Sequence, residues 1–252
     1  MLAMTELNDE IQVWLAPAAH DTPGPIETFC ETLLLEEERV AANRFRVNSA
    51  RHQHVIGRAM ARCLLSSGCC EHHEIGFRIL DHGKPIVDQP EVARRAFNIA
   101  HTRGLVVCGL GQANQWLGVD VEWMDRRTDP ALAERYFAPA EIQQLQSLRT
   151  DDERQKLFLR IWTLKEAFIK AIGTGLSTPL DQFAFEEAKS NEPTLTLADP
   201  DLARDREWTF RAFEPRPGFV AAIAVGEEPA DSKGAKASSR PVRLMNFENQ
   251  LP

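Results

Sequence analysis

The sequence lacks any long apolar run. No window holds the roughly 20 continuous apolar residues that a membrane-spanning helix needs. The segment Met1–Glu10 has no basic stretch followed by an apolar one, so no secretory signal is visible. Hydrophobic residues make up 43% and charged residues 26% of the chain, which is typical of folded globular proteins and excludes collagen-like and wholly disordered classes. We therefore expect a cytoplasmic protein that does not contact membranes.

Basic side chains are in the minority. The 252 residues include 29 Lys and Arg against 37 Asp and Glu, a formal net charge of -8, which argues against broad nucleic-acid binding. One segment departs from this balance: residues 39–62 contain no acidic residue and six arginines, Arg39, Arg44, Arg46, Arg51, Arg58 and Arg62. Guanidinium groups gathered in this way can bind a compact polyanion even on an acidic protein.

Cysteines are few and odd in number. The five cysteines, without a secretory signal, indicate reduced thiols rather than a disulfide framework. The run Cys69–Glu74 combines cysteine, histidine and glutamate, but it lacks the paired spacing of a zinc knuckle. We favour a helix end with buried thiols here, and a zinc site is the alternative.

Periodicity and turn residues predict a chain of mixed helices and strands. Helices are predicted over 26–43, 50–66, 130–136, 139–148 and 152–172, and strands over 12–15, 75–80, 96–101, 105–110, 115–123, 183–185, 195–197, 208–213 and 219–225. The composition then changes to Pro, Ser, Lys, Gly and Ala. Residues 227–252 are predicted to form a flexible tail, in which three apolar residues could dock on the rest of the chain, Leu244, Met245 and Phe247.

The strand segment L-G-V-D-V-E over 117–122 carries two acidic residues. Side chains alternate along a strand, so Asp120 and Glu122 project from the same face. Neighbouring carboxylates repel each other unless a cation lies between them, and hard divalent ions are commonly held in this way. A solvated acidic face on an edge strand is the alternative that this motif alone leaves open.

The helical segment W-T-L-K-E-A-F-I-K over 162–170 is followed by a Gly-x-Gly turn. Glu166 and Lys170 are one helical turn apart and share a face, while Lys165 lies to one side. An ordinary surface ion pair between Glu166 and Lys170 is the simpler interpretation of the helix alone.

Taken together, the two segments resemble the signature of the Sfp-type 4'-phosphopantetheinyl transferases. Glu166 follows Glu122 by 44 positions, and the resemblance covers about residues 10–226. It implies an α+β fold of two pseudo-twofold related α/β halves with the active site between them. An N-terminal half over 1–116 would contribute to coenzyme A binding, a C-terminal half over 117–226 would carry the metal and catalytic motifs, and 227–252 would be the tail.

The resemblance also implies a reaction, the transfer of 4'-phosphopantetheine from coenzyme A to a serine of an acyl or peptidyl carrier protein, with release of 3',5'-ADP. Asp120, Glu122 and Glu166 would hold Mg²⁺, which favours a few carboxylates together with phosphate oxygens and water. Glu166 would also accept the serine proton. Lys170 would stabilise or protonate the departing 3',5'-ADP, and Lys165 would contact the phosphates or the pantetheine arm.

The remaining expected contacts to coenzyme A lie upstream. F-N-I-A-H-T over 97–102 resembles the family motif F-N-x-S-H, so His101 would touch a phosphate, although alanine replaces the usual serine. Gly83-Lys84-Pro85 resembles a turn whose lysine approaches the 3'-phosphate. Arg44 belongs to the same basic set, and Arg58 and Arg62, one helical turn apart, would form a phosphate fork.

The carrier protein would dock near the metal strand. The resemblance implies a carrier serine at the start of an acidic helix, and we expect residues 125–148 to receive it, with Arg126, Arg127 and Arg135 available for acidic carrier residues. We expect a monomer, because the whole site would lie inside one chain.

Three other interpretations compete with this one. A relative that binds coenzyme A without transferring anything need not keep the base and metal ligands. A different magnesium-dependent phosphotransferase is less attractive, because no P-loop or kinase-type glycine loop is visible. A purely structural protein would require both long motifs to be accidental.

Overall fold

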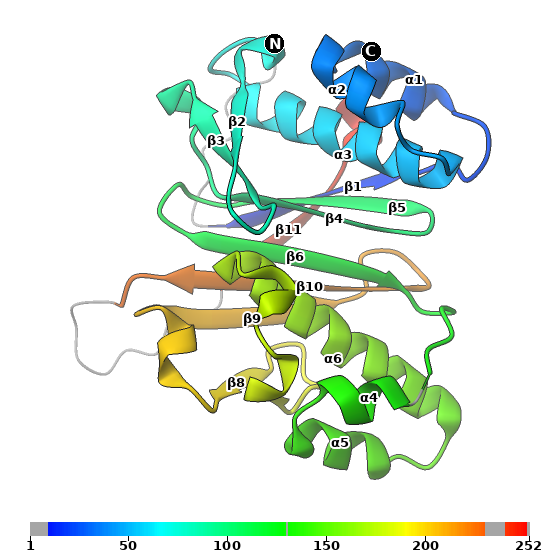
Figure 1. Ribbon diagram of the computed structural model, residues 1–252, viewed down its shortest axis with the longest axis vertical. Coiled ribbons are helices and arrows are strands. Elements are labelled where there is room, and N and C mark those ends of the chain that lie inside the picture. Colours follow the sequence, from blue (N-terminus) through cyan, green and yellow to red (C-terminus); the bar gives the residue numbers. More distant parts are fainter. Residues whose placement is uncertain (1–9, 130, 230–239, 251–252) are drawn as a thin grey trace. The chain divides into compact units, whose positions relative to one another are not determined.

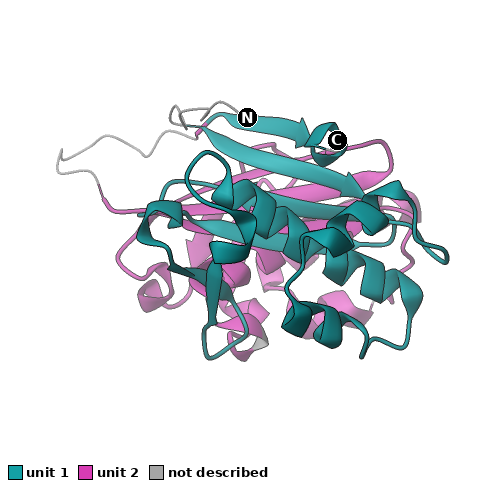
Figure 2. Cartoon of the chain, turned by 90° about the horizontal axis from the view of Figure 1, so that it is seen from above, with its two compact units in different colours: residues 1–114, 241–252 teal, residues 115–240 magenta. Residues whose placement is uncertain are grey.

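The computed structural model describes residues 10–129, 131–229 and 240–250 (Figure 1). The chain forms two compact units, which Figure 2 distinguishes by colour. Unit 1 contains residues 1–114 and 241–252, and unit 2 contains residues 115–240. Each unit combines helices with sheet, which confirms the expected α+β class. The units divide after Asn114, whereas the sequence interpretation placed the boundary after residue 116. Among the described residues, no helix is long and apolar enough to cross a membrane.

Unit 1 is built on a four-stranded sheet in the order β11-β1-β5-β4. The strands are β1 (Ile11–Pro17), β4 (Phe97–Thr102), β5 (Leu105–Leu110) and β11 (Val242–Asn246). The helices are α1 (Pro25–Thr32), α2 (Glu36–Ala42) and α3 (Asn48–Ser66). Helix α3 packs on β4 and β5 through a buried stripe that includes Val55, Ile56 and Met60. The 3-10 turn η1 (His72–Glu74) then leads to a hairpin of β2 (Gly76–Ile79) and β3 (Pro85–Gln89).

Two helices replace the single helix predicted over 26–43. The chain leaves helical geometry at Leu33–Leu35 and begins again at Glu36. The Glu38 carboxylate accepts a hydrogen bond from the backbone N–H of Leu35 at 3.0 Å, which caps the new helix. The same carboxylate is buried against an arginine of α3. This long-range ion pair fixes the position of Glu38, and no local periodicity signals it.

The predicted flexible tail is wrong for residues 242–250. Strand β11 pairs with β1 in parallel, from Ile11 opposite Val242 to Leu15 opposite Asn246. The Phe247 side chain is completely buried in the core of unit 1. The free energy of burying apolar side chains such as Phe247 offsets the entropy lost when the segment becomes ordered. The tail residues 230–239 lie outside the described residues.

Unit 2 is built on the three-stranded sheet β6-β10-β9, with all neighbours antiparallel. The strands are β6 (Trp116–Trp123), β9 (Glu207–Phe213) and β10 (Phe219–Glu227), and a hairpin is formed by β7 (Phe183–Glu186) and β8 (Thr194–Leu197). Helices α4 (Ala131–Tyr136) and α5 (Pro139–Gln146) precede the long helix α6 (Asp151–Ile172). Helix α6 packs on β6 and β10, and an apolar cluster between them forms the core.

Residues at both ends of helix α6 determine where the helix begins and ends. Thr150 and Glu153 form a reciprocal capping box at its start, and acidic residues occupy the first turn. Gly173 ends the helix with a left-handed φ of 74°, which glycine adopts without steric strain. The helix therefore keeps the bounds that the sequence predicts to within one residue at its start, and it presents a fixed face to β6.

The buried Phe247 generates the first prediction. Phe247→Ala should lower the free energy of unfolding by about 3–5 kcal/mol, because a buried aromatic ring is lost and a cavity remains. Leu244→Ala is the matched control from the same segment: Leu244 is 44% exposed, and its loss should be less than about 1 kcal/mol. Urea unfolding followed by tryptophan fluorescence measures both. Equal losses in the two variants would mean that this segment does not pack on unit 1 in solution.

Candidate functional site

The strand motif and the helix motif lie against each other in unit 2. Their contact depends on Gly118, because a Cβ atom there would stand 2.0 Å from the backbone oxygen of Ala167 and 2.5 Å from the backbone nitrogen of Ala171. Since side chains alternate along β6, Asp120 shares the face of Gly118 that is turned to α6. The Lys170 Nζ atom lies 2.6 Å from Asp120 Oδ1. Residues 50 positions apart are therefore joined in one site.

Glu166 is half-buried on α6 among charges of both signs. Burial is the main reason that the pKa of its carboxyl is raised, to about 7, and the negative charge of Asp120 adds to the increase. Lys170 opposes this increase in the pKa, Glu122 adds to it, and Arg126 also opposes it. A carboxyl whose pKa lies near neutrality can exchange a proton with a substrate at neutral pH.

Asp120 is the most buried of the three acids Asp120, Glu122 and Glu166. Burial raises the pKa of its carboxyl, and the ion pair with Lys170 opposes that increase. Its Oδ1 atom accepts from Lys170, but its Oδ2 atom is buried and has no hydrogen-bond partner among the described residues. A buried oxygen in this state carries a desolvation penalty. Such an atom beside further carboxylates fits a hard divalent cation, which takes oxygen ligands.

Glu122, the second acid of β6, is paired with an arginine that the sequence interpretation assigned elsewhere. The Arg126 guanidinium donates a hydrogen bond to Glu122 Oε1. Arg126 was expected only on the docking surface for a carrier. In the structure Arg126 also belongs to the carboxylate site, where its guanidinium offsets part of the negative charge. The spacing of four residues is a weak signal for this pair, since Arg126 follows the strand in a turn.

The expected contact of Lys165 with coenzyme A needs correction. The Lys165 side chain is 0% exposed, and its Nζ atom lies 2.8 Å from Glu141 Oε2. The same Nζ atom donates to the backbone oxygens of Leu180 and Phe183, each at 2.6 Å. All three ammonium hydrogens therefore have acceptors inside unit 2. The reason is helical geometry, because Lys165 is turned about 100° away from Glu166 around α6.

Glu141 is the buried partner that sequence reasoning missed. Its carboxylate accepts backbone hydrogen bonds from Ala138 and Phe185 in addition to the Lys165 ammonium. Burial alone raises the pKa of Glu141 and lowers that of Lys165, and their ion pair opposes both shifts. The position of Glu141 three residues after the cap of α5 was the available signal, since acids there often cap a helix.

The expected phosphate fork of Arg58 and Arg62 also needs correction. Arg62 is 2% exposed and binds both oxygens of Glu38, at 2.7 and 2.9 Å. It also donates to the backbone oxygens of His72 and Ile75. Arg58 pairs with Glu38 at 3.1 Å and stacks over the Phe77 ring, but it keeps some exposure to solvent. Arg62 is thus a structural residue, and only Arg58 remains a candidate phosphate contact.

The other expected coenzyme A contacts belong to unit 1. Arg44 is exposed in the turn after α2, His101 is exposed near the end of β4, and Lys84 is half-buried in the turn of the β2–β3 hairpin. Burial lowers the pKa of Lys84 to about 8. The carboxylates and Lys170 belong to unit 2. The roles of these three basic residues in binding therefore stay predictions.

The buried ion pair generates the second prediction. Lys165→Met should lower the free energy of unfolding by about 3–5 kcal/mol, because Glu141 is left buried without a cation. The double variant Lys165→Met/Glu141→Gln should recover part of that loss, since the isolated charge is gone. Thermal and urea unfolding measure both variants.

Lys156→Met is the matched control for this prediction. Lys156 lies on the same helix in an exposed ion pair with Asp152, and its replacement should leave stability unchanged. If Lys165→Met instead kept full stability and only weakened coenzyme A binding, the phosphate contact would be reinstated.

Comparison with known proteins places this site in a family. The sequence profile of the 4'-phosphopantetheinyl transferase superfamily matches residues 117–224, a range that contains both motifs. The chain is 31% identical to the 4'-phosphopantetheinyl transferase HetI of Nostoc sp. over 226 residues, which cover 88% of this chain and 90% of that one. It is 32% identical to the 4'-phosphopantetheinyl transferase psf-1 of Bacillus pumilus, with 85% of each chain covered.

A third relative is the Sfp protein itself, whose family the two motifs resemble. The chain is 28% identical to the 4'-phosphopantetheinyl transferase Sfp of Bacillus subtilis over 191 residues, which cover 74% of this chain and 80% of that one. These similarities extend well beyond the two motifs and into unit 1. With paired acids on β6, a glutamate and a lysine on α6, and relatives of this identity over most of its length, the chain belongs to the Sfp-type 4'-phosphopantetheinyl transferases.

Proposed function

We propose that this chain transfers the 4'-phosphopantetheine group of coenzyme A to a serine hydroxyl of an acyl or peptidyl carrier protein. The observation that carries the proposal is the group formed by Asp120, Glu122, Glu166 and Lys170 in unit 2. The relatives named above are 4'-phosphopantetheinyl transferases, and the chain matches most of their length. A protein that only bound coenzyme A would not need a carboxyl with a pKa near 7 beside a lysine.

The chain's own residues supply the proton and charge transfers of the reaction. The serine Oγ forms a bond to the β-phosphorus of coenzyme A, the bond from that phosphorus to the bridging oxygen breaks, and 3',5'-ADP leaves. The Glu166 carboxylate takes the serine proton, directly or through a water molecule. Lys170, one helical turn away, offsets the charge that develops on the leaving phosphate or donates a proton to it.

Mg²⁺ is the metal that we assign to the carboxylates. Asp120, Glu122 and Glu166 would hold it, and the partnerless Oδ2 atom of Asp120 supports this assignment. When bound, Mg²⁺ would neutralise charge on the pyrophosphate of coenzyme A. Lys170 Nζ lies 2.6 Å from the other oxygen of the same carboxylate, Asp120 Oδ1. Unit 1 would add basic contacts to the phosphates of coenzyme A from Arg44, Arg58, Lys84 and His101.

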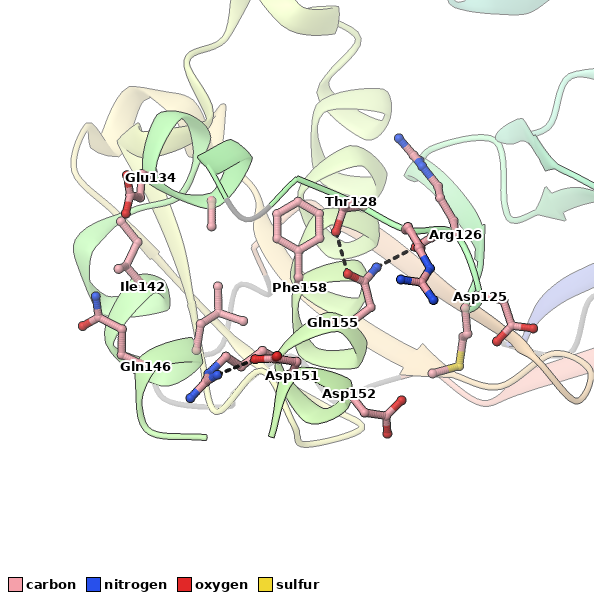
Figure 3. A pocket seen from close by; sticks show the side chains of 15 residues that line it. Asp125, Arg126, Thr128, Glu134, Ile142, Gln146, Asp151, Asp152, Gln155 and Phe158 are labelled. Atoms are coloured by element: carbon pink, nitrogen blue, oxygen red, sulfur yellow. Dashed lines mark hydrogen bonds and ion pairs between the residues drawn. The ribbon is translucent and has the colours of Figure 1, made fainter. Parts of the chain in front are cut away.

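A pocket in unit 2 is suited to a carrier protein (Figure 3). Its volume is about 710 Å³, and Met124, Ile142 and Phe158 give it an apolar interior. Gln155 of α6 holds its rim by donating to the Arg126 backbone oxygen at 2.6 Å and accepting from the Thr128 hydroxyl at 2.8 Å. Arg127 is exposed on the same rim. The lining also holds four acids, Asp125, Glu134, Asp151 and Asp152, so the apolar interior and the exposed Arg127 are the features that suit an amphipathic acidic helix.

The reaction is tested by the intact mass of an apo carrier protein after incubation with the chain, coenzyme A and magnesium. The carrier should gain one phosphopantetheine group, and a chelator should abolish the gain. Asp120→Asn and Glu166→Gln should each lower the rate by at least about 100-fold, because a charged ligand and the base are removed. Glu228→Gln changes an exposed acid of unit 2 that does not line the pocket and should leave the rate unchanged.

Two outcomes would contradict the proposed function. No mass gain with several carrier types, while coenzyme A still binds, would favour a binding protein over a transferase. Full activity of folded Asp120→Asn or Glu166→Gln would remove the metal and base assignments. Urea unfolding of each variant establishes that it is folded.

The expected docking surface, with Arg127 in the pocket lining and Arg135 next to the lining residue Glu134 on α4, generates a separate prediction. Arg127→Glu/Arg135→Glu should raise the KM for the carrier about tenfold, which corresponds to about 1.4 kcal/mol, and should leave the KM for coenzyme A unchanged. The effect should shrink at high salt, because exposed charges are screened. Arg94→Glu in unit 1 reverses one exposed charge away from this surface and should leave both constants unchanged. An equal KM for the carrier in wild type and the double variant would remove these arginines from the docking surface.

A further inference from the structure

Three potential metal ligands meet at the turn that follows α3. Glu71, His72 and His73 each offer one ligand atom, and these atoms lie within 4.8 Å of one another. The residues belong to the Cys69–Glu74 run, for which the sequence favoured a helix end over a zinc site. They lie in unit 1 and have no role in the transfer proposed above. Three consecutive residues at the start of a 3-10 turn therefore bring potential metal ligands together, although they lack the paired spacing of a zinc knuckle.

The backbone beneath these side chains is fixed by a buried arginine. Arg62 donates from Nη1 to the backbone oxygens of His72 at 2.9 Å and Ile75 at 2.8 Å. At the start of the turn, Glu74 Oε2 accepts from the Glu71 backbone N–H at 2.7 Å. A ligand set on a backbone that is already ordered loses less conformational entropy when it binds an ion.

The ligands are accessible, and the nearby thiols have other partners. Glu71 and His73 are exposed and His72 is half-buried, beside a pocket of about 220 Å³. Cys69 Sγ donates to the backbone oxygens of Leu65 and Ser66, and Cys70 Sγ lies 3.7 Å from Cys69 Sγ. Both thiols therefore already have partners within the turn.

We propose that Glu71, His72 and His73 bind one zinc ion, with water at the remaining position. Two imidazole nitrogens and a carboxylate oxygen form a ligand set that zinc accepts with an open coordination site. Mg²⁺ disfavours nitrogen ligands, so this site and the carboxylate site of unit 2 select different ions. Zinc would fasten the turn that leads into β2, and with it the hairpin that carries Lys84.

The test is a zinc titration of the purified full chain against a chromophoric competitor, with thermal unfolding as the second readout. Wild type should bind one zinc ion, and zinc should raise its Tm, because an ion that binds only the folded state stabilises it. His72→Ala/His73→Ala should weaken zinc binding at least tenfold and abolish the rise in Tm. Its Tm without zinc reports whether the variant is folded.

Three control variants make the result specific. His20→Ala/His82→Ala removes two other exposed histidines of unit 1 and should bind zinc as wild type does. Cys69→Ser/Cys70→Ser should also bind normally, and so should Asp120→Asn/Glu166→Gln. Weakened binding in the thiol variant would assign the ion to the cysteines, and weakened binding in the carboxylate variant would assign it to unit 2. Unchanged binding in His72→Ala/His73→Ala would overturn the proposal as well.

Discussion

The close contact of β6 and α6 at Gly118 is the constraint on which the site depends. With 2.0 Å between a Cβ atom at this position and the Ala167 oxygen, no side chain other than hydrogen fits without moving the helix. Asp120 lies about 7 Å further along the strand, at about 3.3 Å per residue. Lys170 lies about 4.5 Å further along the helix from Ala167, at 1.5 Å per residue. The glycine of one motif and the alanine of the other therefore set the spacing that lets Asp120 and Lys170 meet.

Lys165 and Lys170 of helix α6 have different roles. Lys170 follows Glu166 by four residues and is turned only about 40° from it, so both face β6. Lys165 is turned to the interior and joins α5 and the β7 hairpin to α6 through Glu141 and two backbone oxygens. One ion pair thus joins α6 to α5 and the β7 hairpin, while the other lies on the face turned to β6. Replacing Lys165 and replacing Lys170 should therefore fail for different physical reasons.

Local patterns in the sequence predicted the strand and helix of the candidate site in unit 2, but not the long-range contacts of either unit. The capping box at Thr150, the terminal Gly173 and the alternation of 118–122 each depend on neighbouring residues. The family resemblance of the motifs over 117–122 and 162–170 is confirmed by relatives over most of the chain. The break before α2 was missed because Glu38 is held by Arg62, 24 residues away. Strand β11 was missed because its partner, β1, lies at the other end of the chain. Lys165 was assigned to coenzyme A by the family resemblance, and its burial against Glu141, 24 residues earlier, has no local signal in the sequence.

The carboxylate site contains an energetic conflict between its acidic side chains. Lys170 satisfies Asp120 Oδ1, but Oδ2 of the same carboxylate is buried without a hydrogen-bond partner among the described residues. Arg126 pairs with Glu122, yet the pKa of Glu166 is still raised to about 7, so two cationic side chains do not fully offset the three acids and their burial. Removing one acid, or burying an amide in its place, would relieve the repulsion and stabilise unit 2. A site that keeps this conflict instead is suited to a further cation, because added positive charge offsets the repulsion while all three carboxylates remain.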